Sequence, residues 1–274
     1  MILIRSCSGF DELEACVQIQ IETWGYDPTD VLPRKAFRLS QKIGGQVIGA
    51  FDSEIAGASA EGGPESLVGF ALALPGVKIS EQGPKAYLHS HMLAVREGYR
   101  NRGLGAKLKL EQRQEALKRG FRHMEWTFDP LEIKNAYLNI HKLGAISCRY
   151  EEDFYGVSSS RLQGGLPTDR LVAEWRLDSP RVETILEGRR AAARVIQEKI
   201  EERIPVPASI REWKASETDR ERALGVQLEN RRRFQQAFSR GLAVVGFTRD
   251  AQGNGNFELG PLTQDEANLQ YRGM

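Results

Sequence analysis

Two hydrophobic periods run along the chain, and together they predict a protein that combines strands with helices. Short apolar runs bounded by glycine, proline or aspartate are typical of buried strands. They fall at residues 2–5, 46–51, 67–74, 87–95, 123–128, 146–150 and 170–177. Apolar residues at helical spacing predict helices at residues 10–23, 34–43, 104–119 and 135–143. The pattern therefore predicts an α/β fold for this part of the chain.

The strand at 87–95 is the centre of this pattern, because it leads through a short glycine-rich turn into the helix at 104–119. The strand at 123–128 follows, and a strand–helix–strand order places two strands parallel through a right-handed crossover. The earlier strands at 46–51 and 67–74 predict an antiparallel hairpin or meander. We therefore expect a mixed sheet.

The helix at 104–119 has an apolar face that we expect to pack on the sheet. Ala106, Leu110 and Leu117 recur at helical spacing and fall on one side of the helix. Lys109, like the other charged residues of this helix, is expected to point largely elsewhere.

The pattern changes after Asp178. Residues 181–203 predict a helix of mostly charged residues without a long apolar stripe, and Pro205 and Pro207 break the chain behind it. A helix at about 217–238 and a terminal hairpin complete a smaller α+β extension. We therefore divide the chain into a main domain and an extension, at residues 1–178 and 179–274.

Composition narrows the classes of protein. The chain has 274 residues, of which 41% are hydrophobic and 27% charged, as in ordinary soluble domains. A formal net charge of +1 argues against a partner nucleic acid held by a general basic field. The N-terminus lacks a signal-peptide pattern, and no apolar run approaches the roughly 18 residues of a membrane span. Three cysteines without CxxC spacing indicate neither zinc nor disulfides. We expect a cytoplasmic protein without nucleic-acid, membrane or metal partners.

The turn RNRGLGA, residues 100–106, carries the candidate chemistry. The first four N–H groups of a helix have no partner within the helix, and the helix dipole makes that end positive. Gly103 and Gly105 allow a ligand to approach the backbone, while Arg100 and Arg102 add positive charge. The turn therefore predicts a phosphate site.

This turn resembles the acetyl-CoA-binding motif of the GNAT acetyltransferases, in which Arg or Gln is followed by two residues, Gly, any residue, and Gly or Ala. Arg100, Gly103 and Gly105 occupy those positions. The order of elements over residues 1–178 is also similar. The alternative is a dinucleotide-binding turn; Leu108 stands where it needs its third glycine, although Asp129 could supply its acidic residue.

The resemblance implies the GNAT acyl-CoA N-acyltransferase fold, a mixed and mainly antiparallel sheet with a splayed parallel central pair. It implies acetyl-CoA as co-substrate, with the pyrophosphate on the turn, the thioester carbonyl near the backbone of the central strand, and pantetheine near the following short helix. The cofactor-binding residues implied in this way are Leu93, Ala94, Val95, Arg100, Asn101, Arg102, Gly103, Leu104, Gly105, Ala106 and Asn135.

His89 and His91 are the candidate bases. They lie two residues apart on the strand, so both side chains point to one face, and imidazole titrates near neutral pH. HSHMLAV is similar to HLHALAV of the serotonin N-acetyltransferases, in which two histidines remove the proton from the amine. The alternative is that they are hydrogen-bonded core histidines. Ile140 stands where many relatives have a tyrosine that protonates the thiolate; Tyr137 is the candidate substitute, or else a packing residue.

The function implied is acetyl transfer to a primary amine of a small molecule, by direct attack in a ternary complex. An acyltransferase that uses a longer acyl-CoA or a hydroxyl acceptor is one alternative, and a non-catalytic coenzyme A sensor or interaction protein is another. The extension would either cover the acceptor site or form a subunit interface, and the second arrangement would give a homodimer. The identity of the acceptor is not predicted.

Overall fold

The computed structural model describes residues 1–55, 61–80, 83–160, 162–188 and 199–263. The chain divides into two compact units, each described here by itself. The first unit comprises Met1–Lys78, Gly83–Met124 and Ser159–Leu162. The second comprises Ile79–Gln82, Glu125–Ser158 and Gln163–Met274.

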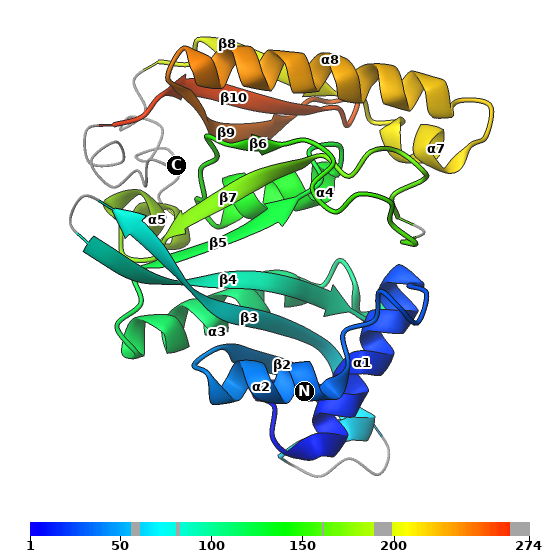
Figure 1. Cartoon of the computed structure of the whole chain (residues 1–274), viewed down its shortest axis with the longest axis vertical. Helices are drawn as coiled ribbons and strands as arrows, with labels where there is room; N and C mark the ends of the chain where they lie inside the picture. Colours follow the sequence, from blue (N-terminus) through cyan, green and yellow to red (C-terminus); the bar gives the residue numbers. More distant parts are fainter. Residues whose placement is uncertain (56–60, 81–82, 161, 189–198, 264–274) are drawn as a thin grey trace. The chain divides into compact units, whose positions relative to one another are not determined.

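The first unit is a sheet covered by helices on both faces (Figure 1). Its strands are β1 (Ile2–Ser6), β2 (Gln46–Asp52), β3 (Leu67–Ser80) and β4 (Gly83–Val95), which lie in the order β1-β2-β3-β4. The first two pairings, β1 with β2 and β2 with β3, are antiparallel, as the hairpin pattern predicts. Its helices are α1 (Gly9–Trp24), α2 (Arg34–Lys42) and α3 (Leu104–Lys118), with short 3₁₀ turns at Pro64–Ser66 and Glu97–Tyr99.

Two apolar clusters fix the two layers of helices. One cluster joins α1 and α2 to one face of the sheet, and Phe37 of α2 meets Phe70 of β3 there at 5.6 Å between ring centroids. The other cluster joins Leu104 and Leu108 of α3 to the opposite face. Strands β2 and β3 therefore have buried residues on both faces, which explains why their sequences are continuous apolar runs.

Helix α3 is rotated relative to the face that its hydrophobic pattern predicts. Its buried residues are Leu104, Leu108, Lys109, Gln112 and Ala116. Ala106, Leu110 and Leu117 are only partly buried. The prediction that Lys109 points elsewhere is wrong: Lys109 is 3% exposed and Gln112 is fully buried, because both take part in a polar cluster under the sheet.

The second unit contains the strands that follow α3 together with the C-terminal segment. β5 (His123–Phe128), β7 (Arg170–Arg176) and β6 (Tyr150–Glu151) are consecutive neighbours in a sheet. Helix α4 (Ile133–Ala136) continues into a π-helix, η3 (Tyr137–Lys142), and α5 (Pro180–Leu186) follows β7. β8 (Glu202–Val206), β9 (Leu242–Arg249) and β10 (Gly255–Pro261) form a second, antiparallel sheet, with α7 (Ile210–Ala215) and α8 (Arg220–Ser239) between β8 and β9.

The C-terminal sheet is joined to the segment before β6 by hydrogen bonds and by aromatic packing. Ser147 and Val244 exchange two backbone hydrogen bonds of 3.1 and 2.7 Å. Phe234 of α8 stacks on Tyr150 of β6 at 5.6 Å and meets Phe257 of β10 edge to face at 5.2 Å. The extension predicted at 179–274 therefore shares a core with residues before Asp178.

Two proline-containing segments differ from the sequence expectation. Residues 202–206, predicted as the end of a charged helix and a break at Pro205, form strand β8; part of that predicted helix lies outside the described residues. β8 is an edge strand, where a residue without an N–H is tolerated. Strand β3 runs through Pro75, beyond Ala73, the last residue paired with β2. Among the described residues, no helix is long and apolar enough to cross a membrane.

A buried carboxylate ties α8 to the loop before β7. Asp169 is 1% exposed and accepts hydrogen bonds from Tyr150 Oη at 2.6 Å and from Arg231 Nε and Nη2 at 2.9 and 2.8 Å. Burial raises the pKa of Asp169, but the hydrogen bonds from Arg231 and Tyr150 lower it further, so the net pKa lies below its usual value.

We predict that Asp169→Asn lowers the free energy of unfolding at pH 7 by roughly 3 kcal/mol, because Arg231 loses its buried partner. The folded-state pKa is depressed, so this stabilisation is present above the unfolded pKa of about 3.9 and is lost as pH falls through the lower folded pKa. Urea unfolding of wild type and variant between pH 3 and 7 should therefore converge toward the acidic end. Glu229→Gln, which removes an exposed pair with Arg232, should show no measurable change; a constant difference at all pH values would contradict this assignment.

Candidate functional site

The glycine turn leaves strand β4 through left-handed backbone. Asn101 has φ = 62° and Gly103 has φ = 79°. A Cβ atom on Gly103 would meet nothing within 4 Å, so conformation rather than crowding requires glycine there. Gly103 is the N-cap of α3, and its carbonyl accepts the first hydrogen bond of the helix, from Lys107 N at 3.1 Å.

The N–H groups that begin α3 are available to a ligand. Within the described part of the chain, no hydrogen bond is donated by the backbone N–H of Gly103, Leu104, Gly105 or Ala106. Gly103 itself is exposed. Together with the positive end of the helix dipole, these groups have the chemistry that anion binding requires.

Side-chain contacts hold the turn in this shape. Arg100 Nε donates to the carbonyl of Val95 at 2.9 Å. Tyr99 Oη donates to Asp52 Oδ2 at 2.8 Å, and the guanidinium of Arg102 lies over the Tyr99 ring at 5.3 Å. The two arginines therefore carry their charge on the exposed side of the turn, next to the free N–H groups.

His89 and His91 lie together on β4, as their spacing predicts. Both side chains are partly buried, and their ring centroids are 6.1 Å apart. Burial lowers the pKa of His91, which keeps its imidazole neutral and able to accept a proton at neutral pH.

Between these histidines and the end of β4, the regular alternation of side chains is broken. Ser90 faces α3, where its Oγ receives a hydrogen bond from Lys109 Nζ at 2.7 Å and donates one to Gln112 Oε1 at 2.9 Å. Leu93 also packs against the α3 cluster, whereas Met92 belongs to the cluster on the opposite face. Residues 90 and 93 would lie on opposite faces of a regular strand, so the strand has a bulge-like irregularity between them.

Lys109 is the residue at this site that sequence reasoning missed. Its ammonium group is buried beneath β4, and burial holds the pKa of Lys109 well below its usual value. A lysine on a helix otherwise rich in exposed lysines gives no sequence signal of burial. Its contact with Ser90, which stands between the two histidines, makes it part of the support of this strand.

The candidate residues of the second unit lie on α4 and the π-helix. Asn135 is exposed, and Ile140, which occupies the position of the expected tyrosine, is 1% exposed. The Tyr137 ring stacks on His141 at 4.5 Å, and the guanidinium of Arg249 lies 4.7 Å from its centroid. π-Helical turns are rare and occur often at functional sites.

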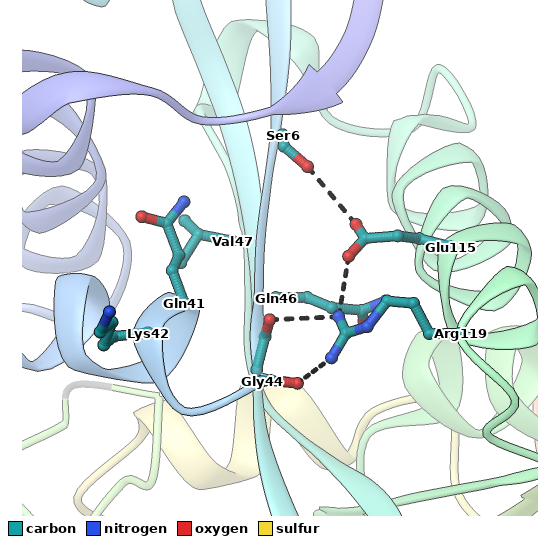
Figure 2. A pocket seen from close by; sticks show the side chains of 9 residues that line it. Ser6, Gln41, Lys42, Gly44, Gln46, Val47, Glu115 and Arg119 are labelled. Carbon is teal, nitrogen blue, oxygen red and sulfur yellow. Dashed lines mark hydrogen bonds and ion pairs between the residues drawn. The ribbon is translucent and has the colours of Figure 1, made fainter.

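A cavity of about 430 Å³ in the first unit lies away from the glycine turn (Figure 2). Its lining includes Ser6, Glu115 and Arg119. Arg119 directly follows the last residue of α3, whereas Gly103 of the glycine turn directly precedes the first residue of that helix. Arg119 Nη1 donates to Glu115 Oε1 at 2.9 Å and to the carbonyl of Gly45 at 3.3 Å. Figure 2 shows the Arg119 side chain directed toward Glu115 and Gly44. The cavity therefore lies at the opposite end of α3 from the predicted anion site, where Arg119 joins α3 to the α2–β2 turn.

Among the described residues, no group of three or more His, Cys, Asp or Glu side chains is placed to hold a metal ion.

Comparison with known proteins identifies a family that part of the chain matches. Residues 15–138 match the model of the acetyltransferase (GNAT) family. No curated protein matches the sequence. NAA60 of Arabidopsis thaliana, solved in complex with acetyl-CoA, has 19% identity, and the match covers 65% of this chain and 100% of that chain with a TM-score of 0.52.

Two further solved structures are similar to the chain at lower scores. The ribosomal-protein-S18-alanine N-acetyltransferase of Escherichia coli has 16% identity over 65% of this chain and 96% of that chain, with a TM-score of 0.47. An aminoglycoside 6′-acetyltransferase type Ii has 16% identity over 65% and 98%, with a TM-score of 0.48.

Residues 15–138 therefore form an acetyltransferase domain of the GNAT family, and the protein is an N-acyltransferase enzyme. The fold class predicted from the sequence, the GNAT acyl-CoA N-acyltransferase fold with additional C-terminal sheet elements, is confirmed.

We predict that Gly103→Ala lowers the free energy of unfolding by about 1 kcal/mol, because a Cβ atom disfavours the left-handed conformation. Gly98→Ala is the matched control: Gly98 lies in the preceding 3₁₀ turn without a left-handed φ, and its Cβ would also meet nothing within 4 Å. Urea unfolding of the two variants should separate them, and equal stability would show that the turn readily adopts another conformation.

Proposed function

We propose that this enzyme transfers the acetyl group of acetyl-CoA to a primary amine of a small molecule. The observation that carries the proposal is the row of N–H groups at the start of α3 that have no partner among the described residues, inside the part of the chain that matches the GNAT model. Gly103, Leu104, Gly105 and Ala106 would donate to the pyrophosphate of coenzyme A, and the charges of Arg100 and Arg102 would add to the attraction.

In the proposed complex the acetyl thioester reaches the irregular part of β4. There the backbone of Leu93, Ala94 and Val95 would hold the thioester carbonyl and stabilise the negative charge that develops on its oxygen during attack. Asn135, whose side chain is exposed, would bind an amide of pantetheine. The proposal is supported by chemistry: the pyrophosphate of coenzyme A matches the N–H groups at the start of α3, and its amides match the side chain of Asn135.

Proton transfer is assigned to three side chains. His89 and His91 would remove the proton from the ammonium form of the acceptor, and the lowered pKa of His91 supports this role because a base must be neutral. The neutral nitrogen then attacks the thioester carbon, and the C–S bond breaks to give the coenzyme A thiolate. Tyr137 would give this thiolate a proton. The second proton that the nitrogen loses as the amide forms would pass through solvent and restore the Tyr137 hydroxyl.

Direct attack is favoured over an acetyl-cysteine intermediate. Cys7 and Cys16 are 3% and 0% exposed within the apolar core, where their sulfur atoms lie 3.9 Å apart. Burial raises the pKa of Cys16 far above its usual value, so its thiol is not a nucleophile. Cys148 Sγ donates to Glu174 Oε1 at 3.3 Å, and a carboxylate neighbour disfavours a thiolate.

A second candidate is a protein that binds coenzyme A without catalysis. It is favoured by one observation: Ile140, buried and without a hydroxyl, stands where relatives place the tyrosine that protonates the thiolate.

We predict that the protein releases thiol from acetyl-CoA in the presence of at least one amine in a panel of tyramine, spermidine and a dipeptide with a free N-terminus. His89→Ala should lower kcat by about 100-fold, because general base catalysis contributes factors of that order. Gln114→Ala, an exposed change on α3, should leave kcat unchanged. Tight binding of coenzyme A without turnover of any panel amine, and without an effect of His89→Ala on slow hydrolysis of acetyl-CoA, would instead support the non-catalytic candidate.

The pH dependence of kcat/KM tests the role of His91 separately. If His91 accepts the proton, activity should persist as pH falls through 6.5, because burial places its pKa below the usual value of 6.5. The acidic limb should then lie below pH 6.5 in the wild type and disappear in His91→Gln, whose residual rate should vary little with pH. An identical acidic limb in wild type and variant would assign that limb to another group.

A further inference from the structure

Lys214 of α7 is a buried cation between two carboxylates. Its side chain is 4% exposed, and Nζ lies 2.6 Å from Asp129 Oδ2 and 3.3 Å from Glu132 Oε1. Burial lowers the pKa of Lys214, but the two carboxylates raise it further, so the net pKa lies above its usual value and the ammonium stays charged. An ammonium group buried in this way is fixed in position by its partners.

Both carboxylates belong to the turn that starts α4. Asp129 Oδ1 accepts a hydrogen bond from Leu131 N at 2.8 Å while Oδ2 accepts from Lys214. The carbonyl of Glu132 accepts from Ala136 N at 3.0 Å, the first hydrogen bond of the helix. Lys214 therefore holds the segment that sets the position and direction of α4.

Helix α7 is itself fixed from its other side. Gly164, in the loop before β7, has φ = 63°, and a Cβ atom there would lie 2.5 Å from the carbonyl oxygen of Lys214. The backbone at Lys214 thus packs directly on the backbone of this loop. This contact fixes the position from which the Lys214 side chain extends toward Asp129.

Arg249 of β9 makes a second contact with the same helix. Its guanidinium lies 4.7 Å from the centroid of the Tyr137 ring, and its Nη2 is 3.5 Å from the carbonyl oxygen of Ile133. Next to it, a Cβ atom on Gly255 would lie 3.2 Å from Ile133 Cγ1, which shows how closely β10 approaches the first turn of α4. The C-terminal segment therefore contacts α4 through both α7 and its sheet.

We propose that the C-terminal segment positions α4 and the π-helix for catalysis, with Lys214 and Arg249 as positioning residues. The inference rests on the proposed function, in which Asn135 binds pantetheine and Tyr137 protonates the thiolate. Lys214 is too deeply buried to touch substrate, so it acts through Asp129 and Glu132. The geometry thus gives the C-terminal segment a part in cofactor binding and not only in stability.

The test compares Lys214→Met and Lys214→Arg with Lys199→Met in the full-length protein. Lys199 belongs to the same segment, but its side chain is 73% exposed and pairs with Glu201 at 3.5 Å. We expect Lys214→Met to weaken coenzyme A binding in calorimetry, and to raise KM for acetyl-CoA, by about tenfold, equivalent to about 1.4 kcal/mol. Lys214→Arg should restore most of the affinity because it restores the charge, and Lys199→Met should match the wild type.

Hydrogen exchange provides a readout that needs no activity. Amides of residues 129–138 should exchange faster in Lys214→Met than in the wild type, with and without coenzyme A. Folded Lys214→Met with unchanged exchange in this segment and unchanged coenzyme A affinity would overturn the proposal. If the wild type binds no coenzyme A, the proposed function fails, but the exchange comparison still decides whether Lys214 holds α4.

Arg249→Met serves if Lys214→Met does not fold, because Arg249 is exposed and its removal leaves no buried charge. We expect it to speed exchange at residues 133–138 and to lower kcat more than it raises KM, since its contact is with Tyr137. Wild-type exchange and kinetics in folded Arg249→Met would overturn the proposal for this second contact.

Discussion

The structure around the candidate site depends on one constraint: residues 96–103 lead from β4 into α3, and the N–H groups at the start of α3 are left without partners in the described protein. The chain enters α3 through left-handed backbone at Asn101 and Gly103, a conformation that favours glycine. The same geometry leaves backbone N–H groups that suit an anion without any dedicated side chain. The two histidines lie near this turn in the sequence, because they belong to strand β4, which precedes it.

The polar cluster beneath β4 adds a second constraint. Lys109 Nζ, Ser90 Oγ and the Gln112 amide form a hydrogen-bonded chain between helix and strand in a place where apolar packing would be expected. An apolar contact tolerates small shifts in register, whereas a buried hydrogen bond is lost if the strand slips by one residue. The cluster therefore fixes which residues of β4 face α3, and with them the face on which His89 and His91 lie.

The sequence predicts the parts of this protein that depend on local chemistry. The strands, the glycine turn and the pairing of His89 with His91 follow from periods and spacings that act over a few residues. The buried face of α3 cannot be predicted in this way, because a hydrophobic pattern counts Lys109 and Gln112 as exposed residues. Their burial depends on partners outside the helix. Strand β8 is missed for a similar reason. In the sequence Pro205 predicts the end of an element, and only the pairing of β8 with β10 shows that this proline lies in the edge strand of a sheet.

The contact of Lys214 with Asp129 and Glu132 belongs to the same class of long-range interaction, since about 80 residues separate the partners. Burying an ammonium group beside carboxylates stabilises a fold little compared with apolar residues of the same volume. What it supplies is a single geometry, because the charge is satisfied only while both carboxylates remain within reach. Acyl transfer has a corresponding need, since misplacing a reacting group by about 1 Å can cost roughly 100-fold in rate. A start to α4 that is fixed by buried charges therefore fits the role in catalysis that we propose for this helix better than a role in the stability of the C-terminal sheet.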